Sequence, residues 1–263
     1  MLKFLNQFKI CLLDYQYWLH FGLLNIKIKY RNSAIGPFWN TISLTILILA
    51  ISFGYASYLV KDDLVNYIYY VSISLITWQF VANCLNEATL MLENKKNLIL
   101  ENDLIDKIFI YEILLTNIII YLHGLFLIFI IGIIAKVQVN IYFLLSLFGF
   151  FLILINLIFL MNLIMILSVI FTDIKKIFEN LIVIAFFSTP IIWKEELLNS
   201  KLIFLLNFNP CYHLLNVFRQ PLLNKIDKQY FISLIISFLI TIIIIIFSYY
   251  IDRKYKKYVK LYL

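Results

Sequence analysis

The stretch FISLIISFLITIIIIIFSYYI at residues 231–251 contains no charged residue and is almost wholly apolar. A helix needs roughly 20 such residues to cross a hydrocarbon core of about 30 Å. Four further uncharged stretches reach or exceed that length, at residues 38–60, 64–86, 113–135 and 137–172. Because lipid offers the backbone no hydrogen-bond partners, each stretch is expected to form a helix. The sequence therefore predicts an all-α membrane protein.

Composition leaves little room for a soluble domain. Of the 263 residues, 63% are hydrophobic and only 14% are charged, which is far from the balance of soluble proteins. The formal net charge of +7 comes from basic residues at the borders of the apolar stretches, where they set topology and meet anionic lipid. No nucleic-acid partner is expected. The cysteines and histidines are too scattered to predict a metal site: Cys11, Cys84, Cys211, His20, His123 and His213.

Charge bias sets the predicted topology. A span near residues 177–193, with Pro190 close to its far end, completes five spans within residues 38–193, and residues 231–251 form the sixth. Most of the 22 basic residues then fall on one side, whereas the two short opposite loops hold only Lys61 and Lys136. The positive-inside rule places both termini in the cytoplasm, with residues 252–263 as a cytoplasmic tail.

Two regions outside these spans have apolar patterns of their own. Residues 1–30 have the spacing of an amphipathic interface helix, which serves as a plain anchor or has a mechanical role. In the external region 194–230, the apolar segments 202–208 and 212–223 are too short to cross a bilayer. They are interpreted as two short re-entrant helices beside a conduit, or as an interfacial lid on lipid. Residues 1–263 are treated as one transmembrane domain.

No residue pattern supports catalysis. A phosphate-binding loop is absent, since the chain lacks even a Gly-Lys dipeptide, so the chain cannot split ATP by that route. The carboxylates of Glu87, Glu112, Asp173 and Glu179 lie near expected cytoplasmic ends of spans, which fits poorly with transport driven by an ion gradient. We expect no enzyme activity and no bound cofactor, and energy for any uphill transport should come from another polypeptide.

Three segments resemble one protein family. KYRNSAIGPFWNTIS at 29–43, FTDIKKIFENLIVIAFFSTPIIW at 171–193 and NPCYHLLNVFRQPLL at 209–223 resemble, in order and spacing, the permease subunits of type 2 ABC exporters for bacterial polysaccharides. These proteins export lipopolysaccharide O-antigen, capsule or teichoic acid. The chain departs from the family pattern at Ile35, where leucine is usual, and at Thr172, where arginine is usual.

The resemblance implies partners and a location. It implies a homodimer joined to two copies of a separate nucleotide-binding ATPase, which holds ATP and Mg. The cargo would be a glycan on an undecaprenyl-pyrophosphate carrier, moved across the bacterial cytoplasmic (inner) membrane among membrane lipids. It also implies two re-entrant helices between the fifth and sixth spans.

Three groups of residues are candidates for this function. Lys29 and Arg31 suit a pyrophosphate, with topology anchoring as the alternative. The loop at residues 93–107 has the spacing of a short amphipathic helix, and the resemblance implies that it couples to the ATPase through Asn97, Leu98, Leu100, Asp103 and Leu104. Aromatic side chains of the first two spans are expected to stack on sugar rings, or to form an interfacial belt: Tyr55, Tyr58, Tyr70, Trp78 and Phe80.

Two other functions stay open from the sequence. One is a type 2 ABC permease for a drug or a small lipid, which would have the same spans without a wide aromatic conduit. The other is a membrane assembly subunit that transports nothing.

Overall fold

The computed structural model describes residues 1–59, 64–102, 106–197 and 199–262, which form helices and turns and no strand. The helices are α1 (Leu2–Leu13), α2 (Tyr15–Lys29), α3 (Phe38–Leu59), α4 (Leu64–Asn94), α5 (Lys96–Asn102), α6 (Ile108–Ile134), α7 (Phe143–Ile170), α8 (Asp173–Ser188), the 3₁₀ turn η1 (Glu195–Leu197), α9 (Ser200–Leu206), α10 (Pro210–Leu222) and α11 (Lys228–Tyr262).

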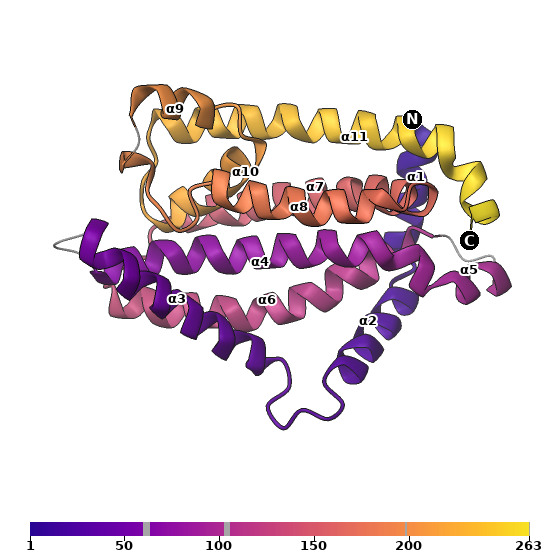
Figure 1. Cartoon of the computed structure of the whole chain (residues 1–263), viewed down its shortest axis with the longest axis horizontal. Coiled ribbons are helices and arrows are strands. Elements are labelled where there is room, and N and C mark those ends of the chain that lie inside the picture. Colours follow the sequence, from indigo (N-terminus) through magenta and orange to yellow (C-terminus); the bar gives the residue numbers. More distant parts are fainter. Residues whose placement is uncertain (60–63, 103–105, 198, 263) are drawn as a thin grey trace.

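A bundle of long helices forms the body of the protein. Figure 1 shows α4, α6, α7, α8 and α11 side by side along one axis. Four of them, α4, α6, α7 and α11, are long and apolar enough to cross a membrane. Helix α4 is the least apolar of the four, and it is also the one whose apolar segment is most buried inside the protein. Several of its polar side chains, among them Ser72, Ser74 and Thr77, are buried by α3, α6, α7 and α8, which pack around it.

The expected third and fourth spans agree closely with α6 and α7. The fifth span was expected at residues 177–193. The corresponding helix, α8, instead begins at Asp173 and ends at Ser188, after 16 residues. That length is below the roughly 20 residues of a full crossing. Thr189 is extended, as the residue before a proline tends to be, so Pro190 ends the helix. The expected first span corresponds to α3, whose part at Phe38–Gly54 is a shorter apolar helix.

The single helix predicted over residues 1–30 is two helices. Asp14 lies between them with φ −76° and ψ 47°, and aspartate has a low helix propensity. Helix α1 buries Phe4 and Phe8 against the bundle, where both rings contact Phe159 of α7. Helix α2 packs on α6. Figure 1 shows α2 and α3 as a V whose closed end, the turn at residues 30–37, stands away from the bundle.

The two ends of the bundle differ. Helices α9 and α10 gather at one end, which we call the α10 end, whereas α1, α5 and both termini lie at the other, the α5 end (Figure 1). Helix α10 approaches α7 so closely that a Cβ on Gly149 would stand 2.5 Å from the Val217 carbonyl oxygen. Glycine at this position lets the two backbones pack together.

Candidate functional site

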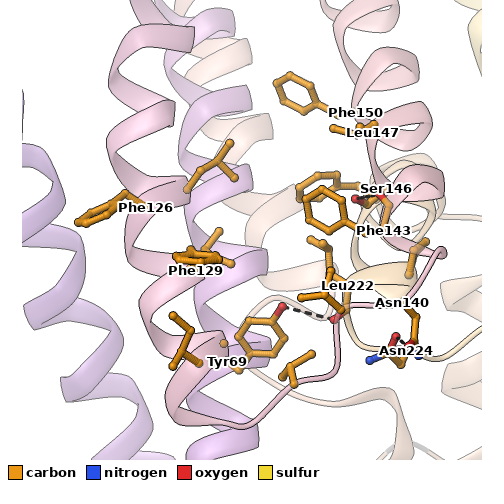
Figure 2. Close-up of a pocket in the computed structure, with 18 of the residues that line it drawn as sticks. Tyr69, Phe126, Phe129, Asn140, Phe143, Ser146, Leu147, Phe150, Leu222 and Asn224 are labelled. Carbon is orange, nitrogen blue, oxygen red and sulfur yellow. Dashed lines mark hydrogen bonds between the residues drawn. The ribbon is translucent and has the colours of Figure 1, made fainter.

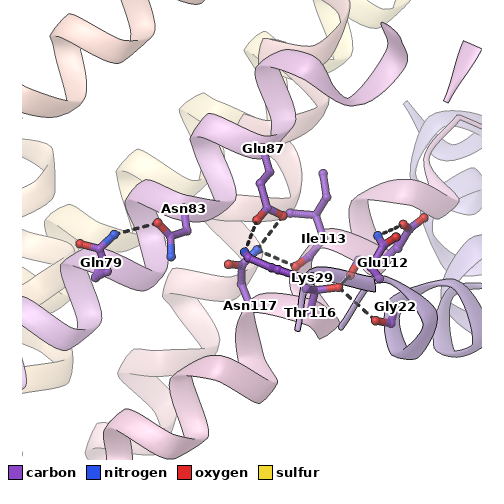
Figure 3. A network of polar contacts seen from close by, with 10 residues as sticks. Gly22, Lys29, Gln79, Asn83, Glu87, Glu112, Ile113, Thr116 and Asn117 are labelled. Carbon is purple, nitrogen blue, oxygen red and sulfur yellow. Dashed lines mark hydrogen bonds and ion pairs between the residues drawn. The ribbon is translucent and has the colours of Figure 1, made fainter. Parts of the chain in front are cut away.

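A row of polar side chains runs along one face of α4. Gln79, Asn83 and Glu87 follow one another at intervals of four residues, which places them on the same side of the helix. The Gln79 amide donates to the Asn83 carbonyl oxygen at 2.8 Å (Figure 3). All three side chains are half-buried. Polar side chains on a helix long and apolar enough to cross a membrane are candidates for a functional surface, and we call these three residues the α4 polar row.

Glu87 joins this row to two other helices. Its carboxylate accepts a hydrogen bond of 3.0 Å from the Asn117 amide of α6 and pairs with the Lys29 ammonium of α2 at 3.4 Å (Figure 3). The Lys29 side chain is 46% exposed, so solvent screens the pair and it adds at most about 1 kcal/mol to stability. The Lys29–Glu87 pair matters for position rather than stability, because it places the end of α2 against the α4 polar row.

A second carboxylate fastens α2 more firmly. Glu112 of α6 is 1% exposed. Its carboxylate pairs with the Lys95 ammonium at 2.5 Å and accepts a hydrogen bond from the Asn25 amide. The same ammonium lies over the rings of Phe21 and Phe109 at 5.6 and 5.5 Å, in the range of cation–π attraction. Helix α2, the end of α4 and the start of α6 are thereby locked together.

The two predicted pyrophosphate contacts differ in their surroundings. Lys29 has Glu87 as its acidic partner. Arg31 is exposed on the turn, and within the described part of the chain its guanidinium makes no hydrogen bond or ion pair. The start of α3 lies beside the middle of α6 rather than at an end of the bundle, because the rings of Phe38 and His123 have centroids 4.7 Å apart.

The predicted sugar-stacking aromatics on α4 are buried within one subunit. The Tyr70 hydroxyl donates to the carbonyl oxygen of Pro190 at 2.8 Å. Trp78 packs on Phe186 of α8, and Phe80 packs on Tyr121 with ring centroids 5.0 Å apart. These three side chains therefore serve packing in the single chain. The side chains of Tyr55 and Tyr58 lie outside the described residues.

The predicted coupling segment contains a short helix, α5. Ile99 is buried, Leu98 is half-buried, and Asn97 and Leu100 are exposed. Asp103 and Leu104 lie outside the described residues. The carboxylate of Glu93, just before α5, pairs with the Lys175 ammonium of α8 at 2.5 Å. The α5 end of the bundle therefore exposes both a polar side chain, Asn97, and an apolar one, Leu100.

Sequence reasoning missed a buried cation at the α10 end. Arg219 is 1% exposed, and its Nη1 donates to the Pro190 carbonyl oxygen at 2.5 Å and to Ser74 Oγ at 3.0 Å. Its Nη2 donates to Asn216 Oδ1 at 2.6 Å, and the guanidinium lies 4.4 Å from the Tyr70 ring centroid. The sequence did indicate this buried cation, because Arg219 stands inside the apolar segment 212–223. An arginine in such a segment needs buried hydrogen-bond partners.

The four long apolar helices indicate a helical membrane protein. No known family model and no curated protein matches the sequence. Among the described residues, no three side chains that commonly bind metals come together.

Proposed function

We propose that the chain is the permease subunit of an ATP-driven exporter that moves lipid-linked polysaccharide across the bacterial inner membrane. The observation that carries this proposal is the α4 polar row, which stays half-buried on a helix long enough to cross a membrane and meets Lys29 through Glu87. A row of polar side chains on such a helix suits a polar cargo. The family resemblance of residues 29–43, 171–193 and 209–223 supports the same function.

The proposed contact for the carrier's pyrophosphate is Arg31, assisted by Lys29. Arg31 is exposed and has no acidic partner among the described residues, so its planar guanidinium remains able to bind two phosphate oxygens at once. Lys29 is the last residue of α2, directly before the same turn. Because solvent screens its pair with Glu87, the Lys29 ammonium can leave that carboxylate for a phosphate at little cost in free energy. Lys29 connects this turn, through its pair with Glu87, to the α4 polar row, which is the proposed path of the cargo.

The proposed assembly is a homodimer of six-span subunits with two ATPase copies. Helix α8 buries none of its residues within this chain and exposes Leu181, Ile184 and Phe187, while α3 exposes Trp39 and Phe53. A second copy would cover these faces. We place both termini in the cytoplasm, α9 and α10 on the outer side as re-entrant helices, and α5 against the ATPase through Asn97 and Leu100.

Co-purification with candidate ATPases tests this function. We expect the chain alone to hydrolyse no ATP, and depletion of the chain in cells to make a carrier-linked glycan accumulate. A small-lipid or drug permease would bind an ATPase without glycan accumulation. An assembly subunit would bind none. Either of these last two results would contradict the proposal.

A further inference from the structure

An apolar groove opens between α6 and α7 near the α10 end. It has a volume of about 490 Å³ and is lined almost wholly by apolar side chains. Figure 2 shows Phe126 and Phe129 of α6 on one side, Phe143 and Phe150 of α7 on the other, and Tyr69 at the lower end. Phe126 and Phe129 are exposed. In a membrane such a groove faces hydrocarbon.

A polar cavity adjoins this groove. It has a volume of about 290 Å³, and Tyr69 and Val137 line both spaces. The Tyr69 hydroxyl donates to the Leu222 carbonyl oxygen at 3.3 Å (Figure 2), which fixes a ring that lines both spaces. The lining therefore changes from apolar to polar at Tyr69.

The polar cavity has an excess of positive charge. Its lining includes three cations, Lys194, Arg219 and Lys225, and two carboxylates, Glu195 and Glu196. Glu196 pairs with Lys225 at 3.1 Å.

The other carboxylate, Glu195, accepts a hydrogen bond from the Tyr212 hydroxyl. The hydrogen-bond partners of Arg219 are all neutral, and Nε of Arg219 is buried with no partner in the described residues. The Lys194 ammonium lies over the Tyr70 ring, 6.0 Å from its centroid. The site therefore attracts an anion.

We propose that the groove and the polar cavity together form a binding site for a phospholipid, with the phosphate near Lys194 and Arg219 and an acyl chain between α6 and α7. Basic pockets next to apolar surfaces between membrane helices bind lipid headgroups by this combination of charge and burial. A free phosphate would leave the groove unfilled, and an uncharged lipid would leave the excess positive charge of the polar cavity unbalanced. This site lies apart from the α4 polar row and does not depend on the proposed cargo.

Binding to the purified full-length chain tests the proposal. The probes are phosphatidylglycerol, a diacylglycerol with the same chains but no phosphate, and glycerol phosphate without chains, measured by native mass spectrometry. We expect phosphatidylglycerol to bind at least about tenfold more tightly than either control, which corresponds to about 1.4 kcal/mol. Equal binding of the diacylglycerol or of glycerol phosphate would overturn the proposal.

Paired variants separate the two halves of the site. Leu147→Trp fills the groove, whereas Leu144→Trp changes an exposed residue one turn earlier on α7 that does not line it. Lys194→Gln removes a cation from the polar cavity, whereas Lys228→Gln removes an exposed cation at the same end that lines neither space. We expect Leu147→Trp and Lys194→Gln each to weaken phosphatidylglycerol binding about tenfold. Affinities equal to those of the matched controls would refute the site.

Discussion

The Asn117 amide of α6 donates a hydrogen bond of 3.0 Å to the Glu87 carboxylate of α4, and the same carboxylate pairs with Lys29 of α2. Three helices that are distant in the sequence therefore meet at one carboxylate. This contact ties the end of α2 to the α4 polar row, while the turn at residues 30–37 stands away from the bundle (Figure 1). The proposed headgroup contact at Arg31 is therefore joined to the proposed path through Lys29.

The α4 polar row gives the first prediction. Asn83→Leu replaces its central amide with an apolar side chain of similar size, and we expect glycan export to fall at least about tenfold, the loss of one polar contact to cargo. Asn86→Leu changes an exposed amide on another face of α4 and serves as the control. Export is measured as surface glycan at equal membrane levels of the chain. Equal export by the two variants would remove the polar row from the path.

The lock around Glu112 gives a stability prediction. Lys95→Ala leaves the nearly fully buried Glu112 carboxylate without its cation, and we expect a loss of about 3–5 kcal/mol in the free energy of unfolding. Adding Glu112→Gln should restore part of this loss, because the buried charge is then gone. Lys96→Ala, at an exposed neighbour, should have little effect. Denaturant titration in detergent measures all three, and an unchanged Lys95→Ala midpoint would contradict the lock.

Gly149 gives a packing prediction. Gly149→Ala places a Cβ 2.5 Å from a backbone oxygen of α10, so the helices must separate, at a cost of about 1–3 kcal/mol. Gly54→Ala is the matched control, because among the described residues an added Cβ there meets no heavy atom within 4 Å. We expect only Gly149→Ala to lower the thermal midpoint. A midpoint equal to that of Gly54→Ala would show that α7 and α10 are farther apart.

Cysteine labelling tests the proposed topology. In a chain without Cys11, Cys84 and Cys211, an impermeant maleimide should label Lys225→Cys in intact cells and Lys257→Cys only after permeabilisation. Even in the native chain Cys11 would react slowly, since burial raises the pKa of its thiol to about 11 and the unreactive thiol form dominates at neutral pH. Labelling of position 257 from outside would reverse the topology.

Much of the fold was predictable from the sequence, because charge-free stretches mark long helices by themselves. Residues 113–135 and 137–172 lie largely within α6 and α7. The expected fifth span ran past Pro190 to residue 193, whereas α8 ends at Ser188. The break at Asp14 was not predicted, since one residue of low helix propensity does not decide whether a helix continues.

The candidate site was predictable only in part. The sequence singled out Lys29, but not its pairing with Glu87, 58 residues away. Tyr70, Trp78 and Phe80 were expected to line a conduit, yet they are buried, because helical spacing does not reveal which neighbouring helix covers a face. The role of Arg219 depends on the Pro190 carbonyl oxygen and Ser74, partners that only the folded chain brings together.

Reconstitution with the partner ATPase tests the central claim most directly. In proteoliposomes, we expect ATP-dependent movement of an undecaprenyl-pyrophosphate-linked glycan only when both proteins are present. Arg31→Ala should reduce this movement at least about tenfold and Arg31→Lys less, because lysine keeps the charge but loses the bidentate fork. ATP hydrolysis without cargo should stay unchanged in both variants. No glycan movement by the wild type, or equal movement by wild type and Arg31→Ala, would contradict the account.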